Sequence, residues 1–478
     1  MFFNSFEFAV FLPAVVVVFW LLVRFRKLRN WWLIIASYYF YCCWDWRFAV
    51  LIVLSTLVDY CAGLFIHHAK TARARKIWLM TSLIINLGCL GFFKYCDFFI
   101  DNFRTLMASA GIDVPLQPLQ IILPVGISFY TFQTLSYTLD IYRGTLKPTT
   151  DFSKFALFVV FFPQLVAGPI VRAHEFMPQL ERAPKYDEDA TVRAFHQILS
   201  GLFKKIMIAD VLAVTFVDPA FRNPEAFSGF WLLLAVYAYA IQIYCDFSGY
   251  SDIAIGSARL FGFELPVNFN RPYLATSLTD FWRRWHISLS TWLRDYLYIP
   301  LGGNKFGPIL TYRNLLITML LGGLWHGAAW NFVIWGGIHG VGLAVEKILF
   351  GGKKLLHLEG RSKAVLFLRW LITFHIVMLC WVFFRAQPTE SLTTLEVAWV
   401  FISRIVTLAD GASGFSWWFA GTLALGYAIH FSSLRCKKAC SDFYAGSGRV
   451  IQAGISVVLL LIYTLFGVGG TAFIYFQF

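Results

Sequence analysis

Apolar runs long enough to enter a lipid bilayer recur along almost the whole chain, and they constrain the fold more than any other feature. A helix needs roughly 20 residues to cross a hydrocarbon layer of about 30 Å. The chain is 58% hydrophobic and only 14% charged, far from the roughly one-quarter charged composition of soluble domains. We therefore expect an all-α polytopic integral membrane protein that forms one membrane-embedded domain over residues 1–478.

The candidate spans are read from the apolar runs alone. They are 8–23, 31–43, 49–66, 77–93, 119–139, 155–167, 195–214, 230–247, 314–324, 331–348, 365–384, 392–405, 417–430 and 450–466. Several are shorter than the roughly 17 residues that a spanning helix needs. Some of these runs are therefore predicted to be half-helices or re-entrant segments.

Basic residues gather in short clusters between the apolar runs, so most of the formal charge of +13 reflects topology. The first run precedes a basic cluster at 24–29, which predicts an uncleaved anchor with the N-terminus outside the cytoplasm. A second basic cluster at 67–76 is predicted to be cytoplasmic, and 97–118 external. The aromatic residues lie in apolar runs without interleaved basic residues, which disfavours nucleic-acid binding.

The nine cysteines are scattered and show no metal-ligand spacing, so no metal is expected. Cys436 and Cys440 flank Lys437 and Lys438, and we expect them in a reduced cytoplasmic loop.

The middle of the chain, 129–330, carries charged and helix-breaking residues between its apolar runs. Irregular backbone at membrane depth survives only where protein or water surrounds it, which predicts a central polar cavity. The stretch 246–252 is predicted to end one span and open the next. Ser251 or Asp252 would then cap a helix, and Asp246 would face the cavity.

His326 is a titratable imidazole inside an apolar stretch, flanked by Trp325 and by small residues that let helices approach closely. An ionisable group at membrane depth is a functional-site hypothesis by default. A buried histidine bonded to a backbone carbonyl is the competing interpretation. His339 would lie about 220° away on a continuous helix, so structural packing is its expected role.

A second polar segment, 280–296, places titratable groups among aromatic residues. On a helix Asp280 and Arg284 are neighbours, and Arg284 and Asp295 return to nearly one face. This pattern favours buried, paired charges lining a cavity, although an interfacial amphipathic helix with solvated charges also fits.

The chain holds no phosphate-binding loop, serine elbow, zinc-protease motif or dinucleotide fingerprint in a credible setting. Without such a nucleophile, the simplest acyl transfer is direct. A histidine deprotonates an acceptor hydroxyl, which attacks an activated acyl donor.

Four segments carry a resemblance that covers nearly the whole chain. They are 268–273 (NFNRPY), 280–299 with 285–288 (WHIS), 323–328 (GLWHGA) and the terminal 473–478 (FIYFQF). Their order and spacing resemble the membrane-bound O-acyltransferase family, in the bacterial branch typified by alginate O-acetyltransferase membrane subunits. The teichoic-acid D-alanyl transfer proteins are more distant.

The resemblance implies a helical bundle with half-helices around a central funnel, with a catalytic core at about 119–350. It implies that His326 is the base and that His286 orients the acceptor or stabilises charge. The remaining residues expected to line the funnel are Trp325, Arg284, Asp295, Asp246 and Asn331.

The resemblance also implies acetyl-CoA as the cytoplasmic donor. A periplasmic partner protein or polysaccharide would accept the acetyl group, and the chain would lie in the bacterial inner membrane. Exported alginate or a similar polysaccharide is the expected final acceptor. Two alternatives stay open: D-alanyl transfer to teichoic acids, and a non-enzymatic polysaccharide transporter or flippase, which broken helices also favour.

Overall fold

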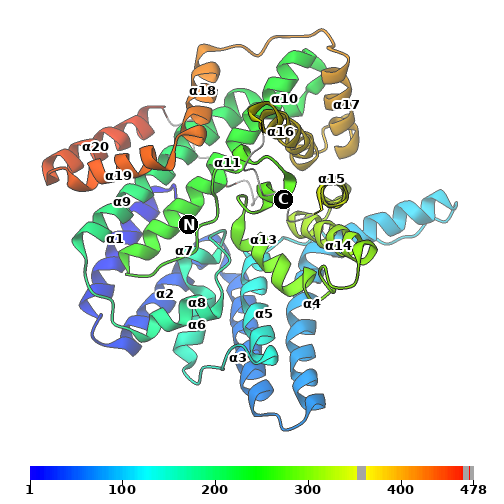
Figure 1. Ribbon diagram of the computed structural model, residues 1–478. Coiled ribbons are helices and arrows are strands. Elements are labelled where there is room, and N and C mark those ends of the chain that lie inside the picture. Colours follow the sequence, from blue (N-terminus) through cyan, green and yellow to red (C-terminus); the bar gives the residue numbers. More distant parts are fainter. Residues whose placement is uncertain (352–361, 467–472, 474–478) are drawn as a thin grey trace. The chain divides into compact units, whose positions relative to one another are not determined.

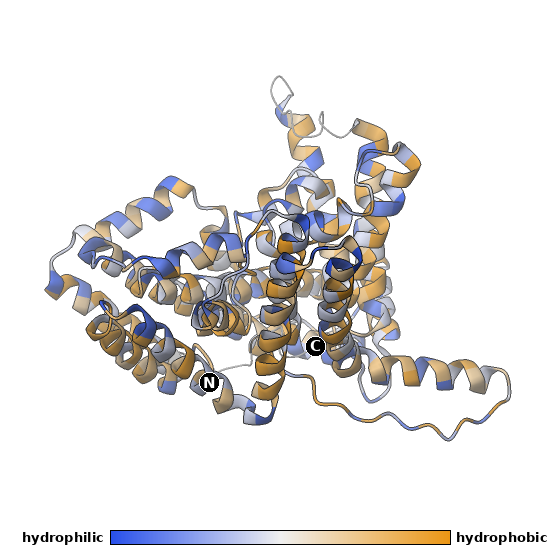
Figure 2. Cartoon of the chain, turned by 90° about the horizontal axis from the view of Figure 1, so that it is seen from below, coloured by the Kyte–Doolittle hydropathy of each residue, from blue (hydrophilic) through white to orange (hydrophobic). Residues whose placement is uncertain are grey.

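The computed structural model describes residues 1–351, 362–466 and 473, and every regular element in them is helical (Figure 1). Apolar residues run along most of these helices (Figure 2). Within these described ranges, five helical stretches are long and apolar enough to cross a membrane: Arg26–His68, Ala72–Ser109, Gly229–Leu260, Trp330–Phe350 and Lys363–Arg385. The prediction of an all-α, multi-pass membrane protein is confirmed.

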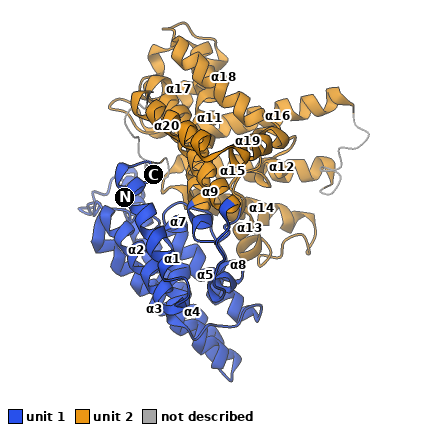
Figure 3. Cartoon of the chain, turned by 90° about the vertical axis from the view of Figure 1, so that its left-hand side faces the viewer, with its two compact units in different colours: residues 1–188, 257–266 blue, residues 189–256, 267–478 orange. Residues whose placement is uncertain are grey.

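The chain forms two compact units, shown in separate colours in Figure 3. Unit 1 comprises residues 1–188 and 257–266, and unit 2 comprises 189–256 and 267–478. The elements of unit 1 are α1 (Phe6–Leu21), α2 (Arg26–Asp45), η1 (Trp46–Phe48), α3 (Ala49–His68), α4 (Ala72–Ser109), α5 (Ile127–Arg143), α6 (Phe152–Val160), α7 (Phe162–Leu165) and α8 (Ala173–Glu181).

Unit 2 holds the remaining elements, apart from the last turn of α11. They are α9 (Glu188–Leu202), η2 (Phe203–Asp210), η3 (Ala213–Val217), α10 (Asp218–Arg222), η4 (Pro224–Ala226), α11 (Gly229–Leu260), η5 (Pro272–Leu274), α12 (Leu278–Trp282), α13 (Ile287–Leu293), η6 (Arg294–Tyr298), α14 (Pro308–His326), α15 (Trp330–Phe350), α16 (Lys363–Arg385), α17 (Thr394–Val406), α18 (Trp417–Phe431), α19 (Leu434–Gly446) and α20 (Arg449–Phe466).

Unit 1 departs from the hydropathy prediction around α4 and α5. Helix α4 extends well beyond the apolar run 77–93 and continues through Ser109, into the stretch 97–118 that was expected to be external. The run 119–139 becomes helical only at Ile127, because Pro124 cannot continue a helix ladder. The Asp97 carboxylate also accepts the backbone N–H groups of Leu119 and Ile121, at 2.7 and 2.9 Å. This side chain satisfies donors that a helix would otherwise use.

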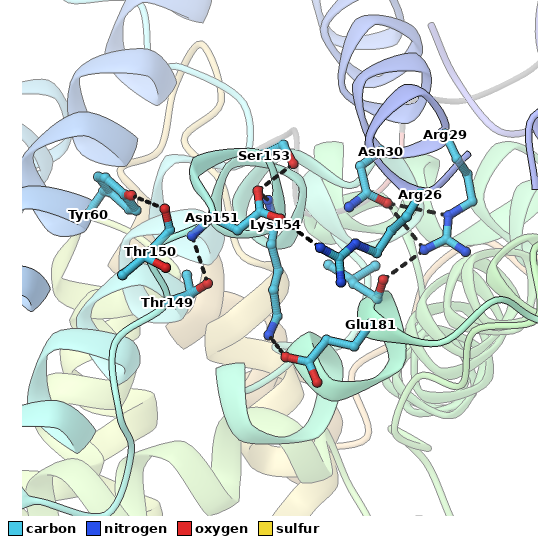
Figure 4. A network of polar contacts seen from close by, with 11 residues as sticks. Arg26, Arg29, Asn30, Tyr60, Thr149, Thr150, Asp151, Ser153, Lys154 and Glu181 are labelled. Carbon is cyan, nitrogen blue, oxygen red and sulfur yellow. Dashed lines mark hydrogen bonds and ion pairs between the residues drawn. The ribbon is translucent and has the colours of Figure 1, made fainter. Parts of the chain in front are cut away.

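Charged side chains hold α2, α6 and α8 together within unit 1 (Figure 4). Asp151 caps α6 and pairs with Arg26 at 3.7 Å, while Lys154 on α6 pairs with Glu181 on α8. Arg29 is fully buried and donates to two backbone carbonyls at the end of α8. The basic cluster at 24–29 therefore has a packing role besides its topological one.

Short helices replace one predicted span and one predicted helix. The run 155–167 is divided at Phe161 into α6 and α7, and α7 begins next to Pro163. The segment 280–296 is divided into α12, α13 and the π-helical η6. These pieces agree with the expectation of half-length helices.

Helix α11 overturns the predicted break at 246–252, because it runs unbroken from Gly229 to Leu260. Gly249 has a packing reason instead of a turn-forming one. A Cβ atom on Gly249 would lie 2.7 Å from the backbone oxygen of Gly201, which is closer than real Cβ contacts allow. The glycine therefore lets α11 approach α9 closely.

Candidate active site

His326 stands at the last position of α14, where the chain breaks before α15 begins at Trp330. The two helices pack closely because glycines face backbone atoms. A Cβ on Gly323 would lie 2.2 Å from the carbonyl oxygen of Phe332, and one on Gly336 would lie 2.3 Å from that of Met319. The prediction that small residues near His326 permit close helix packing is confirmed.

Three aromatic rings from the described part of the chain lie against the imidazole of His326, which is only 4% exposed. Their centroids are 5.0 Å (Trp325), 5.0 Å (Trp335) and 5.1 Å (Phe384) from that of the imidazole, all edge to face. A bulky reactant can therefore touch the imidazole only if a neighbouring group moves. The predicted central cavity stays a prediction.

Asn331 helps to position one of these rings, that of Phe384, although it does so through the backbone of α16. Its Nδ2 donates to the backbone carbonyls of Phe383 (3.0 Å) and Ala386 (3.3 Å), at the end of α16. The same end of α16 carries Phe384, which contacts His326. Asn331 was expected to line the funnel. In the structure it attaches α16 to the start of α15.

His286 lies immediately before α13, with a backbone φ of 43°. The left-handed region is costly for a residue with a Cβ, and such strain clusters at functional sites. The neighbouring backbone is bonded to the loop 268–273. Ile287 donates its N–H to the carbonyl of Asn268 (3.0 Å), and Asn270 donates its N–H to that of Arg284 (2.9 Å).

The side chain of Asn268 determines the tautomer of His286. Asn268 Oδ1 accepts the backbone N–H of Ser288 (3.1 Å) and the Ser288 hydroxyl (2.8 Å), so this atom is an acceptor. His286 Nδ1 lies 3.3 Å from it and must donate. The ring therefore carries its proton on Nδ1 and a lone pair on Nε2. Complete burial lowers the pKa of His286 to about 3, so it is neutral at physiological pH.

Trp325 brings the two predicted histidines together. Its indole centroid is 5.0 Å from that of His326 and 5.9 Å from that of His286. Phe247 of α11 also contacts His286, with 4.7 Å between the two ring centroids. Residues that lie far apart in the sequence thus form one aromatic cluster with an imidazole at each side of Trp325.

Arg284 and Asp295 do not lie on one continuous helix, so the interpretation that placed them on a common helix face was wrong. Arg284 pairs with Asp280, with 2.9 Å between Nε and Oδ1, as four-residue helical spacing predicted. Asp295 pairs with its neighbour Arg294 at 2.6 Å. Residues eleven apart share a face only on one continuous helix. The helix is interrupted around His286, so Arg284 and Asp295 belong to different pieces.

Asp246 belongs to a buried charge network in unit 2. Lys205 lies 2.8 Å from Asp246 and 2.7 Å from Asp210, and each of the three side chains is at most 5% exposed. Further along α11, Asp252 accepts from Lys204 and from the amide of Gln197. The capping role predicted for Asp252 is therefore wrong.

His339 lies closer to His326 than a continuous helix would allow. The break after α14 turns the chain back, and the His339 ring contacts Trp335 at 4.9 Å and Trp282 at 5.1 Å. Trp335 therefore touches both His339 and His326. These ring contacts agree with the packing role expected for His339.

Sequence reasoning missed Asn268, Trp335 and Phe384 as partners of the histidines. Asn268 lies in the segment 268–273, which entered the sequence interpretation only as a motif of the resemblance. Trp335 and Phe384 lie in apolar runs where aromatic residues are common, so spacing gave no signal. Only the tertiary contacts identify them.

The chain was compared with known proteins. Residues 145–386 match MBOAT, the membrane-bound O-acyltransferase family. A probable alginate O-acetylase of Azotobacter vinelandii is 42% identical over 411 residues, 85% of this chain and 78% of the relative. A peptidoglycan O-acetyltransferase of Helicobacter pylori is 40% identical over 410 residues, 80% and 76% of the two chains. A teichoic acid D-alanyltransferase of Streptococcus thermophilus is 30% identical over 281 residues, 54% and 68% of the two chains.

Proposed function

Because this chain belongs to the membrane-bound O-acyltransferase family, and is thus a membrane-embedded O-acyltransferase, we propose that it acetylates an exported polysaccharide. The donor is cytoplasmic acetyl-CoA, and a periplasmic partner completes the transfer. Relatives named for O-acetylation of alginate and of peptidoglycan support acetyl as the group and a polysaccharide as the acceptor class. The D-alanyl alternative has weaker support, since that relative matches only 54% of this chain.

The contact of both histidines with Trp325 is the observation that carries the proposal. His326 acts as the general base. It takes the proton of an acceptor hydroxyl, whose oxygen forms a bond to the thioester carbonyl carbon. The carbon–sulfur bond then breaks, and the thiolate leaves and is protonated. A positioned base contributes about 10² to 10⁴ in rate, and holding both reactants supplies much of the remainder.

His286 acts as an acceptor of hydrogen bonds. Its Nδ1 proton is directed at Asn268, so its Nε2 lone pair can accept from a hydroxyl. A neutral imidazole in this tautomer has no second proton to give to a developing oxyanion. Of the two roles that the resemblance implied, orientation of the acceptor hydroxyl therefore fits His286 better than charge stabilisation.

The proposed topology follows the positive-inside rule. The chain lies in the bacterial inner membrane with its N-terminus outside the cytoplasm, and the acetyl group crosses the membrane through the catalytic core at about 119–350. The helical stretches of membrane-spanning length support a multi-pass arrangement.

The test compares strains that carry wild-type, His326→Ala, His286→Ala or His67→Ala chains. His67 is exposed and lies outside the aromatic cluster, so its variant is the matched control. Mass spectrometry measures ester groups on the exported polysaccharide and on partner proteins. We expect esters to be lost in the His326→Ala strain, strongly reduced in the His286→Ala strain and unchanged in the control. Full ester content in the His326→Ala strain would falsify the assignment of the base. Alanyl esters instead of acetyl esters would refute the proposed donor.

A further inference from the structure

Cationic side chains from three separate segments gather around His430, at the end of α18 in unit 2. Lys204 comes from η2, Arg271 from the loop 268–273 and Lys437 from α19. Burial lowers the pKa of His430, and the positive charges of Lys437, Arg271 and Lys204 lower it further. We call Lys204, Arg271, Lys437 and His430 the cation cluster.

The carboxylate that reaches the cation cluster is Asp252, which already accepts from Lys204 and from the amide of Gln197. Three cations around one carboxylate leave a local charge of about two positive units. Burial lowers the pKa of the Lys437 ammonium, and Lys204 and Arg271 lower it further, while Asp252 opposes them. A bound anion would relieve this repulsion.

His430 offers an N–H group that is not used within the described part of the chain. Its Nε2 accepts the backbone N–H of Tyr273 at 3.2 Å, so its proton must lie on Nδ1. The His430 side chain is fully buried, and Nδ1 has no hydrogen-bond partner among the described residues. A buried donor without an acceptor is costly, so native proteins rarely leave one. This donor points to a ligand with acceptor oxygens.

Arg271 supplies a second unused donor. Its Nε is buried and has no hydrogen-bond partner among the described residues, and its Nη1 reaches the carbonyl of Ser432 only at 3.5 Å. Its backbone has a φ of 45°, in the left-handed region that a residue with a Cβ rarely adopts. Strained backbone of this kind persists where the surrounding structure holds it, and it clusters at ligand sites.

We propose that the cation cluster is a binding site for a phosphate ester, with Arg271 and Lys437 at its accessible side and Lys204 and His430 at its buried side. Arginine and lysine are the usual partners of phosphate oxygens, and a neutral imidazole N–H adds a directed hydrogen bond. The phosphate belongs either to the thioester donor or to an anionic lipid headgroup. The donor case rests on the proposed function, and the lipid case does not.

A ligand bound at the cation cluster would also affect the position of His286 in the candidate active site. The loop 268–273 carries Arg271, and it also carries Asn268, which holds the tautomer of His286. Tyr273 of the same loop bonds His430 through its backbone N–H. A phosphate held by Arg271 would therefore stabilise the loop that positions His286.

The experiment measures binding without any chemical step. Purified full-length protein in neutral detergent is titrated with coenzyme A and separately with pyrophosphate. The Arg271→Gln and Lys437→Gln variants remove one charge each, and Lys438→Gln is the control, since Lys438 is an exposed neighbour on α19. We expect the Kd of coenzyme A to rise by about tenfold or more in the two variants and to stay within about twofold in the control. Lys437 is only half-buried, so its variant remains informative if Arg271→Gln fails to fold.

A second arm identifies the source of the phosphate. Native mass spectrometry measures phosphatidylglycerol retained after extraction from vesicles of defined composition. Weakened coenzyme A binding with unchanged lipid retention supports the donor, and the converse supports a lipid headgroup. If the two variants match wild type in both measurements, the proposal is overturned. If wild-type protein binds coenzyme A through the cation cluster and yet transfers no acetyl group, the site stands and the proposed function fails.

Discussion

Replacing Asn268 tests whether the tautomer of His286 matters for the reaction. Asn268 is 1% exposed, and its Oδ1 accepts from Ser288 N–H, from the Ser288 hydroxyl and from His286 Nδ1. Asn268→Leu removes this acceptor and keeps the volume similar. The Ser288 hydroxyl can rotate to another acceptor and the His286 proton can move to Nε2, but the backbone N–H of Ser288 stays buried without an acceptor. A buried, unsatisfied donor costs about 1–3 kcal/mol, so the variant should lose about that much stability.

The catalytic effect should exceed what a loss of stability alone produces. Without Asn268 Oδ1, the His286 ring is free to move its proton to Nε2 and lose its acceptor lone pair. In the serine proteases, holding the wrong tautomer lowers kcat by about 10⁴, and an orienting histidine should have a smaller effect, on the order of 10². Asn268→Asp is the matched control, because its carboxylate keeps the acceptor and still receives all three donors.

The assay measures kcat for acetyl transfer in purified, correctly folded protein, with the thermal midpoint recorded for each variant. We expect Asn268→Leu to lose about 100-fold in kcat and Asn268→Asp to stay within about tenfold of wild type. A wild-type kcat for folded Asn268→Leu would refute the reasoning. Equal inactivity of the two variants would also refute it, because they differ in the acceptor atom.

Three further predictions concern burial around the site. Lys205→Met leaves two buried carboxylates without their cation and should destabilise the protein by about 3–5 kcal/mol, whereas Arg193→Met at an exposed ion pair should leave the thermal midpoint unchanged. Phe384→Ala removes a ring from His326 and should accelerate diethyl pyrocarbonate modification of that histidine, measured by peptide mass spectrometry; an unchanged rate would show that Phe384 does not limit access. Because burial lowers the pKa of His286 to about 3, folding favours its neutral form, so its contribution to stability is complete above about pH 6.5 and is lost as the pH falls from there toward 3. A His286→Gln variant should lose that part of the acid sensitivity in a series of melting curves, and an identical acid profile would contradict the assignment.

Hydropathy predicted the helices whose apolar runs are long and bounded by polar residues. The run 331–348 became α15 (Trp330–Phe350) and the run 365–384 became α16 (Lys363–Arg385), since in such runs burial in lipid decides the structure. Hydropathy failed at 246–252, where polar residues sit inside a helix. Polar residues in an apolar run can mark the end of a helix or a polar face within it. Here they form such a face, because Lys204 and Lys205 on another helix pair with its carboxylates.

The sequence predicted those members of the candidate site whose side-chain chemistry is unusual for their surroundings. His326 and His286 are rare titratable groups in apolar surroundings, and Trp325 adjoins one of them. The common face predicted for Arg284 and Asp295 is not formed, because one residue with a positive φ, His286, interrupts the helix on which that periodicity depended. The groups that hold the histidines in place are ordinary asparagines and aromatic residues, whose role depends on contacts that the sequence does not reveal.

Both histidines stand next to helix ends, so their positions depend on loop contacts and not on a helix ladder. Asn268 holds His286 directly, and Asn331 holds the end of α16 that places Phe384 on His326. Among the described residues, the hydrogen-bond partners of the two asparagines are different, so changes in stability from Asn268→Leu and Asn331→Leu should add to within about 0.5 kcal/mol. If both imidazoles act on one acceptor beside Trp325, the changes in activation free energy caused by the two variants should not add. A double-mutant cycle on kcat should then give a coupling of about 0.5–3 kcal/mol, and strict additivity in kcat would indicate that the two histidines serve separate steps.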